Sequence, residues 1–337
     1  MRGSIEQQRG FACPQEPFDD AYLDALTRAR SSRLAELFSK CFASTLRARA
    51  PHLLDALKAF CAEPGQFPDS WPAALGELRA AMLTRPLDPE AALAAADHLA
   101  RARGLAGRQP EPPLARVRGV PVRVRPLPDG LTCSERPEIA SYEAAFDIIA
   151  TAAPVYLPWV ERVVHTLVPV QSRPGGTTSS SFELLPGVVA LSYTSPAICL
   201  ADALVHEASH QHFYLLAQAG PVHDGSDTDL YYSPGPRAER PIDRILLAYH
   251  AFANILLFYR ACRQSRLVDA DVCLRREQSY AQSLAMLDAP LEKTAALTTI
   301  GRSLYEPLAE RVRASTSEPA AARAAESCAP ARAQITA

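Results

Sequence analysis

The stretch ALVHEASHQHFYLL, residues 203–216, constrains the fold more than any other part of the sequence. Apolar residues surround its polar ones at nearly every helical angle, which is typical of a helix buried in a protein core. His206 and His210 are four residues apart and therefore share one face of that helix. Burying two histidines and Glu207 is costly unless they are hydrogen-bonded or bind a metal. The stretch therefore predicts a buried helix that carries a metal site.

The ends of this helix can also be predicted. Ser195 and Pro196 suit its start, while Gly220 and Pro221 suit its end. His212 falls on another side of the helix from the histidine pair, so we interpret it as a packing or supporting residue. The motif His-Glu-x-x-His has only three fixed residues and arises by chance, so a hydrogen-bonded core without metal is the alternative.

A third metal ligand is expected, because two histidines hold an ion weakly. Residues 240–264 form a second apolar helical pattern, and Pro241 suits its first turn. His250 and Asn254 form part of a polar stripe within this pattern. We predict His250 as the third ligand, with a core histidine as the alternative. The lesser candidates are Asp243, Glu239 and His223.

Residues 220–241 join the two helices and are rich in Gly, Pro, Asp and Ser, which predicts a long loop. Loops of this length within a compact domain are often functional. An arginine near the second helix could bind a carboxylate with two hydrogen bonds. For any single arginine in this loop, however, a solvent-exposed position without a binding role is the simpler interpretation. The residues concerned are Tyr231, Tyr232, Arg237 and Arg240.

The pattern along the chain predicts a mainly helical α+β fold. Residues 1–110 are expected to form a helical region that serves as a scaffold or a peptide-docking surface. Residues 111–314 are expected to form a metal-binding catalytic domain, in which a small, mostly antiparallel sheet packs on the two long helices. Residues 315–337 lack a sustained apolar face and are expected to be disordered. Strands are expected in 115–127, 165–172 and 179–193, and a further helix in 140–165.

The strand expected just before the histidine helix is relevant to function. Such a strand commonly lines the cleft beside the helix, and its exposed edge can pair with an extended peptide. The sequence therefore suggests a peptide as a binding partner, but does not identify it or define the oligomeric state.

Composition limits the partners and the location of the protein. The net charge of −2 over 337 residues argues against nucleic acid as the main partner. The eight cysteines include no C-x-x-C pair and are most simply free thiols in a reducing compartment. The N-terminus lacks an apolar signal region, and no segment is expected to span a membrane. We therefore expect a cytoplasmic protein that does not act in the membrane.

Three histidines with open coordination positions suit two chemistries. In a zinc metallopeptidase, Zn(II) lowers the pKa of a water molecule and Glu207 acts as the general base. In a non-haem oxygenase, Fe(II) leaves adjacent positions for a 2-oxo acid and O2. The local spacing of the histidines does not distinguish these chemistries, and a catalytically inactive peptide-binding module is a third hypothesis.

Three segments together resemble a known family. SSSFELLPGVVALSY, LVHEASHQH and DLYYSPGPRAERPIDRILLAYHAF are similar to the HExxH-type α-ketoglutarate-dependent peptide β-hydroxylases, which modify ribosomally made peptides. The similarity covers roughly residues 160 to 265. Within the motif, Ala208 and Ser209 replace the bulkier pair typical of the family, although neither residue is expected to bind metal.

The resemblance implies an Fe(II)-dependent dioxygenase that uses 2-oxoglutarate and O2 to hydroxylate the β-carbon of a side chain in a precursor peptide. His206 and His210 match the metal-binding histidines of the family, and His250 fits its downstream ligand. Arg240 fits the arginine expected to bind the 2-oxoglutarate carboxylate. Glu207 would then orient a ligand or donate a hydrogen bond rather than act as a hydrolytic base.

Overall fold

The computed structural model describes residues 4–62, 81–82, 88–102, 113–124, 127, 131–172, 176–183 and 185–327. The protein is mainly helical, with a small mixed sheet and a separate two-stranded antiparallel sheet. This arrangement confirms the mainly helical α+β class. The expected boundary between the two domains near residue 110 lies outside the described residues.

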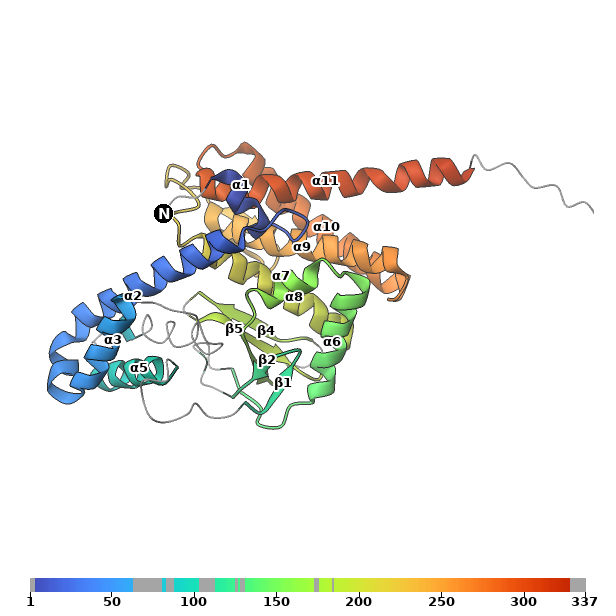
Figure 1. Ribbon diagram of the computed structural model, residues 1–337. Helices are drawn as coiled ribbons and strands as arrows, with labels where there is room; N and C mark the ends of the chain where they lie inside the picture. Colours follow the sequence, from blue (N-terminus) through green and yellow to red (C-terminus); the bar gives the residue numbers. More distant parts are fainter. Residues whose placement is uncertain are drawn as a thin grey trace, which may run out of the picture.

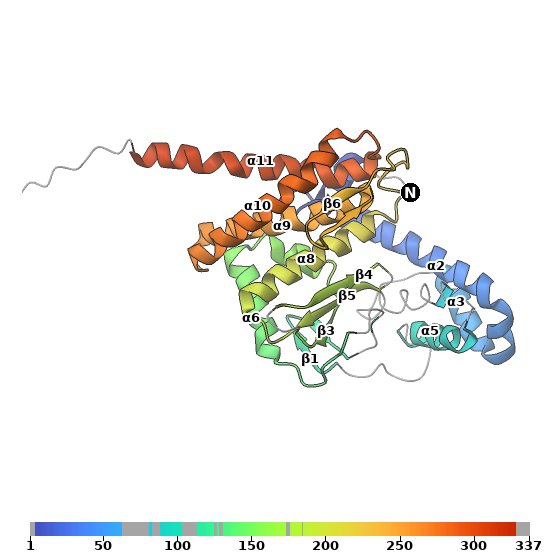
Figure 2. The same ribbon diagram turned by 180° about the vertical axis from the view of Figure 1, so that it is seen from behind.

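Two long helices form the centre of the molecule. Helix α8 (Ala197–Leu216) packs against α9 (Ile242–Ser265), and strands β4 and β5 contact α8. Helices α10 (Ala270–Lys293) and α11 (Thr299–Ser327) pack on α9, so the sheet and these helices lie on opposite sides of the central pair (Figures 1 and 2). The apolar sequence around the histidine motif thus reflects a helix with neighbours on several sides, as predicted.

The main sheet has the strand order β1-β2-β3-β5-β4. The outer pairs are antiparallel, but β2–β3 and β3–β5 are parallel, so the sheet is mixed rather than mostly antiparallel. Parallel neighbours need a long crossover, which α6 (Ile139–Ala152) and α7 (Tyr156–Glu161) provide between β2 and β3. The strands are β1 (Ala115–Val117), β2 (Val120–Val122), β3 (Thr166–Val170), β4 (Ser179–Phe182) and β5 (Leu185–Ser192).

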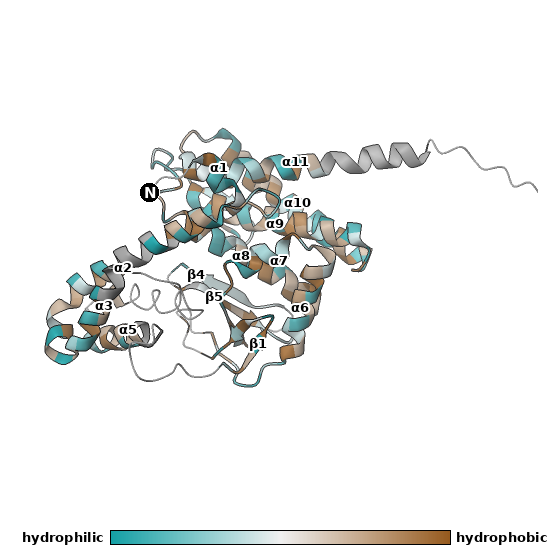
Figure 3. Ribbon diagram, in the orientation of Figure 1, coloured by the Kyte–Doolittle hydropathy of each residue, from teal (hydrophilic) through white to brown (hydrophobic). Residues whose placement is uncertain are grey.

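The N-terminal helices form a second, smaller packing unit. Helices α2 (Asp20–Arg49), α3 (Pro51–Ala62) and α5 (Pro89–Ala102) share a core that includes Phe38, Phe42 and Leu46. Hydrophobic and hydrophilic residues alternate around α3 (Figure 3), as expected for a helix with one buried face. The first turns of α2 do not belong to this smaller unit, because Tyr22 and Leu26 pack into the main core.

The segment before α2 is buried in the main core, which the sequence patterns do not predict. It contains α1 (Ile5–Gln8) and the short 3-10 helix η1 (Arg9–Phe11). Its buried backbone carbonyls need hydrogen-bond donors. Trp159 Nε1 donates to Gly10 O at 3.0 Å, His250 Nε2 to Phe11 O at 2.9 Å, and Asn254 Nδ2 to Ala12 O at 2.9 Å.

Helix α9 is long and apolar enough to cross a membrane by length and composition, contrary to the expectation that no segment would be. However, 78% of its most apolar window is buried within the protein, where α8, α10 and α11 cover it. The apolar character of α9 is therefore explained by its position in the core. Helix α11 also differs from expectation, because it continues to Ser327 and projects from the body of the protein (Figure 1).

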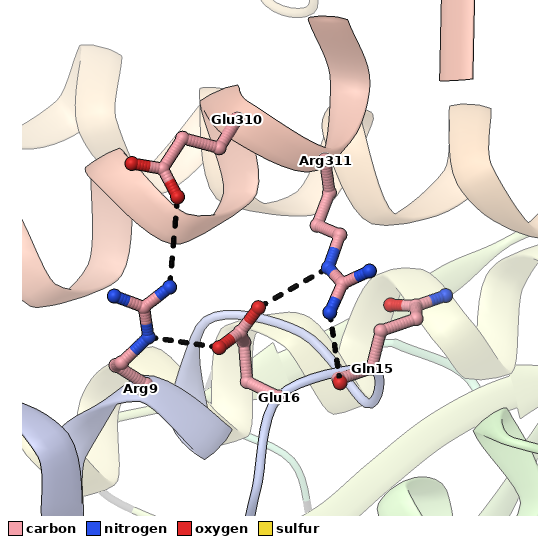
Figure 4. A network of polar contacts seen from close by, with 5 residues as sticks. All are labelled: Arg9, Gln15, Glu16, Glu310 and Arg311. Carbon is pink, nitrogen blue, oxygen red and sulfur yellow. Dashed lines mark hydrogen bonds and ion pairs between the residues drawn. The ribbon is translucent and has the colours of Figure 1, made fainter. Parts of the chain in front are cut away.

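An ion-pair network joins the N-terminal segment to α11 (Figure 4). The Glu16 carboxylate accepts hydrogen bonds from Arg9 at 2.8 Å and Arg311 at 3.1 Å, and its side chain is only 8% exposed. Burial raises the pKa of Glu16, but the hydrogen bonds from the two arginines outweigh it and hold the pKa below its ordinary value. Glu16 is therefore charged at neutral pH, and its ion pairs connect the N-terminal segment to α11.

We expect Glu16→Gln to lower the free energy of unfolding by about 1–2 kcal/mol at pH 7, because it leaves two partly exposed arginines without their charge partner. Because the pKa of Glu16 is lower in the folded protein, this stabilisation is fully present at pH values above the ordinary pKa of a carboxyl group. It is lost as the pH falls through the native pKa. Urea unfolding at pH 7 and pH 3 should therefore show the wild type and the variant converging at low pH.

Glu310→Gln is the matched control for this network. Glu310 also pairs with Arg9, but at 3.5 Å and with 63% of its side chain exposed. Its substitution should change stability by less than about 0.5 kcal/mol. A loss for Glu16→Gln that is equal at both pH values would contradict the electrostatic account.

Candidate metal-binding site on helix α8

Four polar side chains follow one another at four-residue intervals along α8: Asp202, His206, His210 and Tyr214. The rings of His206 and His210 are perpendicular, with centroids 4.6 Å apart, and both residues keep part of their surface exposed. The Tyr214 ring stacks beside His210 at 6.1 Å. The structure thus brings the two predicted metal-binding histidines together on one face.

Hydrogen bonds to the sheet fix the rotation of α8. Ser179 on β4 donates to Glu207 Oε1 at 2.7 Å, and the Gly187 N–H on β5 donates to Gln211 Oε1 at 2.9 Å. Gly187 has a φ of 74°, and an added Cβ would lie 2.5 Å from the His165 ring, so a side chain there would clash. The two bonds hold the side of α8 that faces the β4–β5 hairpin.

His212 has a structural role, in agreement with its interpretation as a packing residue. Its Nε2 lies 2.9 Å from the Trp159 carbonyl oxygen, and its ring stacks on the Trp159 indole at 4.0 Å. Burial lowers the pKa of His212 to about 3, although the hydrogen bond to Trp159 opposes this shift. His212 is therefore neutral and donates from Nε2.

Several buried polar atoms on α8 and α9 have no hydrogen-bond partner among the described residues, including Gln211 Nε2, His212 Nδ1 and His250 Nδ1. Two more such atoms belong to the His-Glu-x-x-His motif. They are His210 Nδ1 and Glu207 Oε2, and both are buried. Burial lowers the pKa of His210 well below its ordinary value, and unfavourable electrostatic interactions with His206, His250 and Arg244 lower it further. A neutral imidazole is the form that binds a metal ion. The pair therefore has the chemical character of a metal-binding site.

His250, the predicted third ligand, lies on the second helix as predicted but uses one ring nitrogen elsewhere in the core. It is fully buried on α9, and its Nε2 donates to the carbonyl of Phe11 in the N-terminal segment. Burial lowers the pKa of His250 to about 4, partly offset by this hydrogen bond, so the ring is neutral. His250 and Asn254 use their polar groups to hold the N-terminal segment, which accounts for the polar stripe on α9.

No group of three His, Cys, Asp or Glu side chains able to hold a metal is found within the described residues. His250 therefore does not form such a group with His206 and His210. Among the lesser candidates, Asp243 pairs with Arg244 at 3.6 Å, Glu239 is exposed on a strand, and His223 forms an isolated bridge with Leu297. Of the predicted metal ligands, the described residues bring together His206 and His210 alone.

The loop between α8 and α9 contains a small hairpin made of β6 (Tyr231–Ser233) and β7 (Ala238–Arg240). Asp227 fixes the start of this hairpin by accepting hydrogen bonds from Tyr231 and Thr294. Tyr232, Arg237 and Arg240 are exposed. Arg240 lies at the end of β7, opposite Tyr231.

Arg244 and Tyr214 are two residues near the site that the sequence analysis missed. Arg244 lies in the first turn of α9, and its charge acts on both His210 and Tyr214. Burial raises the pKa of Tyr214 to about 12, with Arg244 opposing and Glu207 reinforcing the shift. Tyr214 could have been predicted by continuing the four-residue spacing of the motif along the helix. Arg244 could not, because it comes near the histidines only when α9 packs on α8.

Comparison with known proteins gives no family for this chain: no family model matches it, and no curated protein matches it either.

We expect His250→Gln to fold and to retain metal binding, because a glutamine amide can still donate to the Phe11 carbonyl. His250→Ala should lose about 2–4 kcal/mol of stability, because it leaves that carbonyl unpaired and creates a cavity. The cobalt(II) stoichiometry measures metal binding, and thermal unfolding measures the loss of stability. His206→Gln is the control that should abolish metal binding, and loss of metal from a folded His250→Gln protein would restore His250 as a ligand.

Proposed function

We propose that this protein is an Fe(II)- and 2-oxoglutarate-dependent oxygenase that hydroxylates the β-carbon of a side chain in a ribosomally made precursor peptide. The observation that carries the proposal is the perpendicular pair of His206 and His210, with an unpartnered nitrogen on a neutral His210. The choice of an oxygenase rests on the resemblance of residues 160–265 to the peptide β-hydroxylases.

His206 and His210 would hold the iron, which would supply the activation of O2. The described residues offer no third ligand, so more coordination positions stay open to small molecules than the sequence predicts. A co-substrate that binds through two of its own oxygen atoms suits such a site. The chain must then bind the remote carboxylate of that co-substrate.

Arg244 is the better placed of two arginines for that carboxylate. Its charge acts on His210, and it lies in the first turn of a 24-residue helix, where the helix dipole also favours an anion. Its side chain is 44% exposed, so a ligand can reach it, although its Nε already pairs with Asp243 at 3.6 Å. Arg240, which the resemblance favours, is exposed on β7 and remains the alternative.

Glu207 and β4 are suited to bind and orient the peptide. Ser179 fixes one oxygen of the Glu207 carboxylate, while the other is buried without a partner near the histidine pair. β4 is the last strand of the described sheet at this side and carries Ser179 itself. A peptide that pairs with β4 as an additional strand would therefore lie next to α8.

A zinc metallopeptidase is the second candidate. The observation that favours it is the unpartnered Oε2 of Glu207, because a carboxylate oxygen beside a metal site can act as a general base.

We also propose a cytoplasmic location. None of the six cysteines whose side chains the structure describes forms a disulfide bond, as is usual in a reducing compartment.

We expect the anaerobic Fe(II) protein to show the visible charge-transfer band of a chelated 2-oxo acid when 2-oxoglutarate is added. Arg244→Met should weaken 2-oxoglutarate binding about 10- to 100-fold, because it removes a charge-assisted hydrogen bond, and should leave Fe(II) binding unchanged. Arg240→Met is the matched control and should bind 2-oxoglutarate like the wild type. The reverse result for the two variants would assign the carboxylate to Arg240.

Substitution of Glu207 by Gln separates the two candidate functions. The amide keeps the shape of the side chain and can still accept the Ser179 hydrogen bond, but it is not a base. An oxygenase should retain Fe(II), the 2-oxoglutarate band and some turnover in this variant. A peptidase should lose essentially all cleavage of a casein substrate, and zinc-dependent cleavage by the wild type without any band would overturn the oxygenase proposal.

A further inference from the structure

Asp202 is a buried carboxylate that neither the motif nor the proposed mechanism uses. It lies on α8 one turn before His206 and is only 8% exposed. Tyr259 on α9 donates a hydrogen bond to its Oδ2 at 2.9 Å, and Tyr280 on α10 donates to the same oxygen at 3.1 Å. Neither donor carries a compensating charge, so the carboxylate is held by two neutral groups.

The surroundings connect Asp202 to the histidine pair. The Phe252 ring contacts a residue of each group, with its centroid 6.1 Å from that of His206 and 5.4 Å from that of Tyr280, which bonds Asp202. Tyr259 and Tyr280 stack at 6.2 Å and enclose the other side of the cluster. Burial raises the pKa of Asp202, while the hydrogen bond from Tyr259 and the interactions with His206 and Arg276 oppose this shift. Arg276 also contacts Cys199, on the preceding turn of α8.

A buried carboxylate is costly, and an apolar residue of similar size would pack in this core at lower cost. Its presence one helical turn before His206, on the same face of α8 as the neutral His210, suggests a purpose. A divalent cation on His206 and His210 would carry a charge of +2 that the imidazoles do not neutralise. A carboxylate fixed one turn away, in a medium of low polarity, attracts that cation more strongly than a solvated carboxylate would.

We propose that Asp202 is a positioning residue that supplies the buried negative charge for a divalent cation bound by His206 and His210. It does so without contacting the cation, and Tyr259 and Tyr280 hold its carboxylate in place. This inference rests on the metal-binding site of the proposed function, and it adds a residue outside the His-Glu-x-x-His motif to that site. It applies equally to an iron and to a zinc centre.

Cobalt(II) titration of the full chain, followed by the visible spectrum, tests this inference. Asp202→Asn keeps the size of the side chain and removes its charge. It should weaken cobalt(II) binding about 10- to 100-fold, in the range typical of residues that support metal ligands. Asp202→Ser is a second neutral variant with different packing, and it should show a comparable loss.

Asp288→Asn is the matched control. Asp288 on α10 also accepts a hydrogen bond from a tyrosine, Tyr305, at 2.8 Å, but it belongs to the contact between α10 and α11. This variant should lose stability without any change in cobalt(II) affinity. Thermal unfolding is measured for every variant, so that cobalt(II) affinities are compared only between folded proteins.

The outcomes separate this inference from the proposed function. Wild-type protein that binds no cobalt(II) would overturn the metal site and the inference together. Wild-type binding with unchanged affinity in folded Asp202→Asn and Asp202→Ser would leave the site intact and overturn the role of Asp202. Failure of both neutral variants to fold would assign Asp202 a purely structural role and would likewise overturn the inference.

Discussion

The structure depends on how one buried helix satisfies its polar side chains. Helix α8 carries Asp202, Glu207, Gln211 and His212 into a hydrophobic core, where each must find a partner. Two tyrosines, a serine, a backbone amide and a backbone carbonyl provide those partners. These contacts fix α8 against the sheet on one side and against α9 and α10 on the other. The His206 and His210 rings lie side by side on the same helix with centroids 4.6 Å apart, and His210 is neutral with one nitrogen unpartnered.

The N-terminal segment is the second structural element that the site needs. Residues 10–12 lie in the core beneath α9, where Trp159, His250 and Asn254 supply their hydrogen bonds. This explains why the polar stripe on α9 does not face the histidine pair. Glu16 then joins the end of the segment to α11 through Arg9 and Arg311. The core around α9 is therefore assembled from both ends of the chain.

Much of the local structure could be predicted from the sequence. The apolar surroundings of the motif predicted α8, proline and period-two patterns predicted α9 and the strands, and the four-residue spacing predicted the histidine pair. The role of His250 could not be predicted, because its partner Phe11 is 239 residues away and lies in a segment without a periodic pattern. Parallel pairing of β3 with β2 and β5 depends likewise on tertiary packing. Arg244 was missed because only the contact between α8 and α9 brings it near His210.

The central claim is that two histidines, and not three, hold a divalent metal on α8. X-ray absorption fine structure of the protein loaded with one equivalent of iron(II) counts the imidazole ligands directly. The account predicts two imidazoles, with light atoms in the remaining positions, and their loss in His206→Gln. Three imidazoles would show that His250 leaves Phe11 to bind the metal, and a spectrum without imidazole would show that the α8 pair is not a metal site.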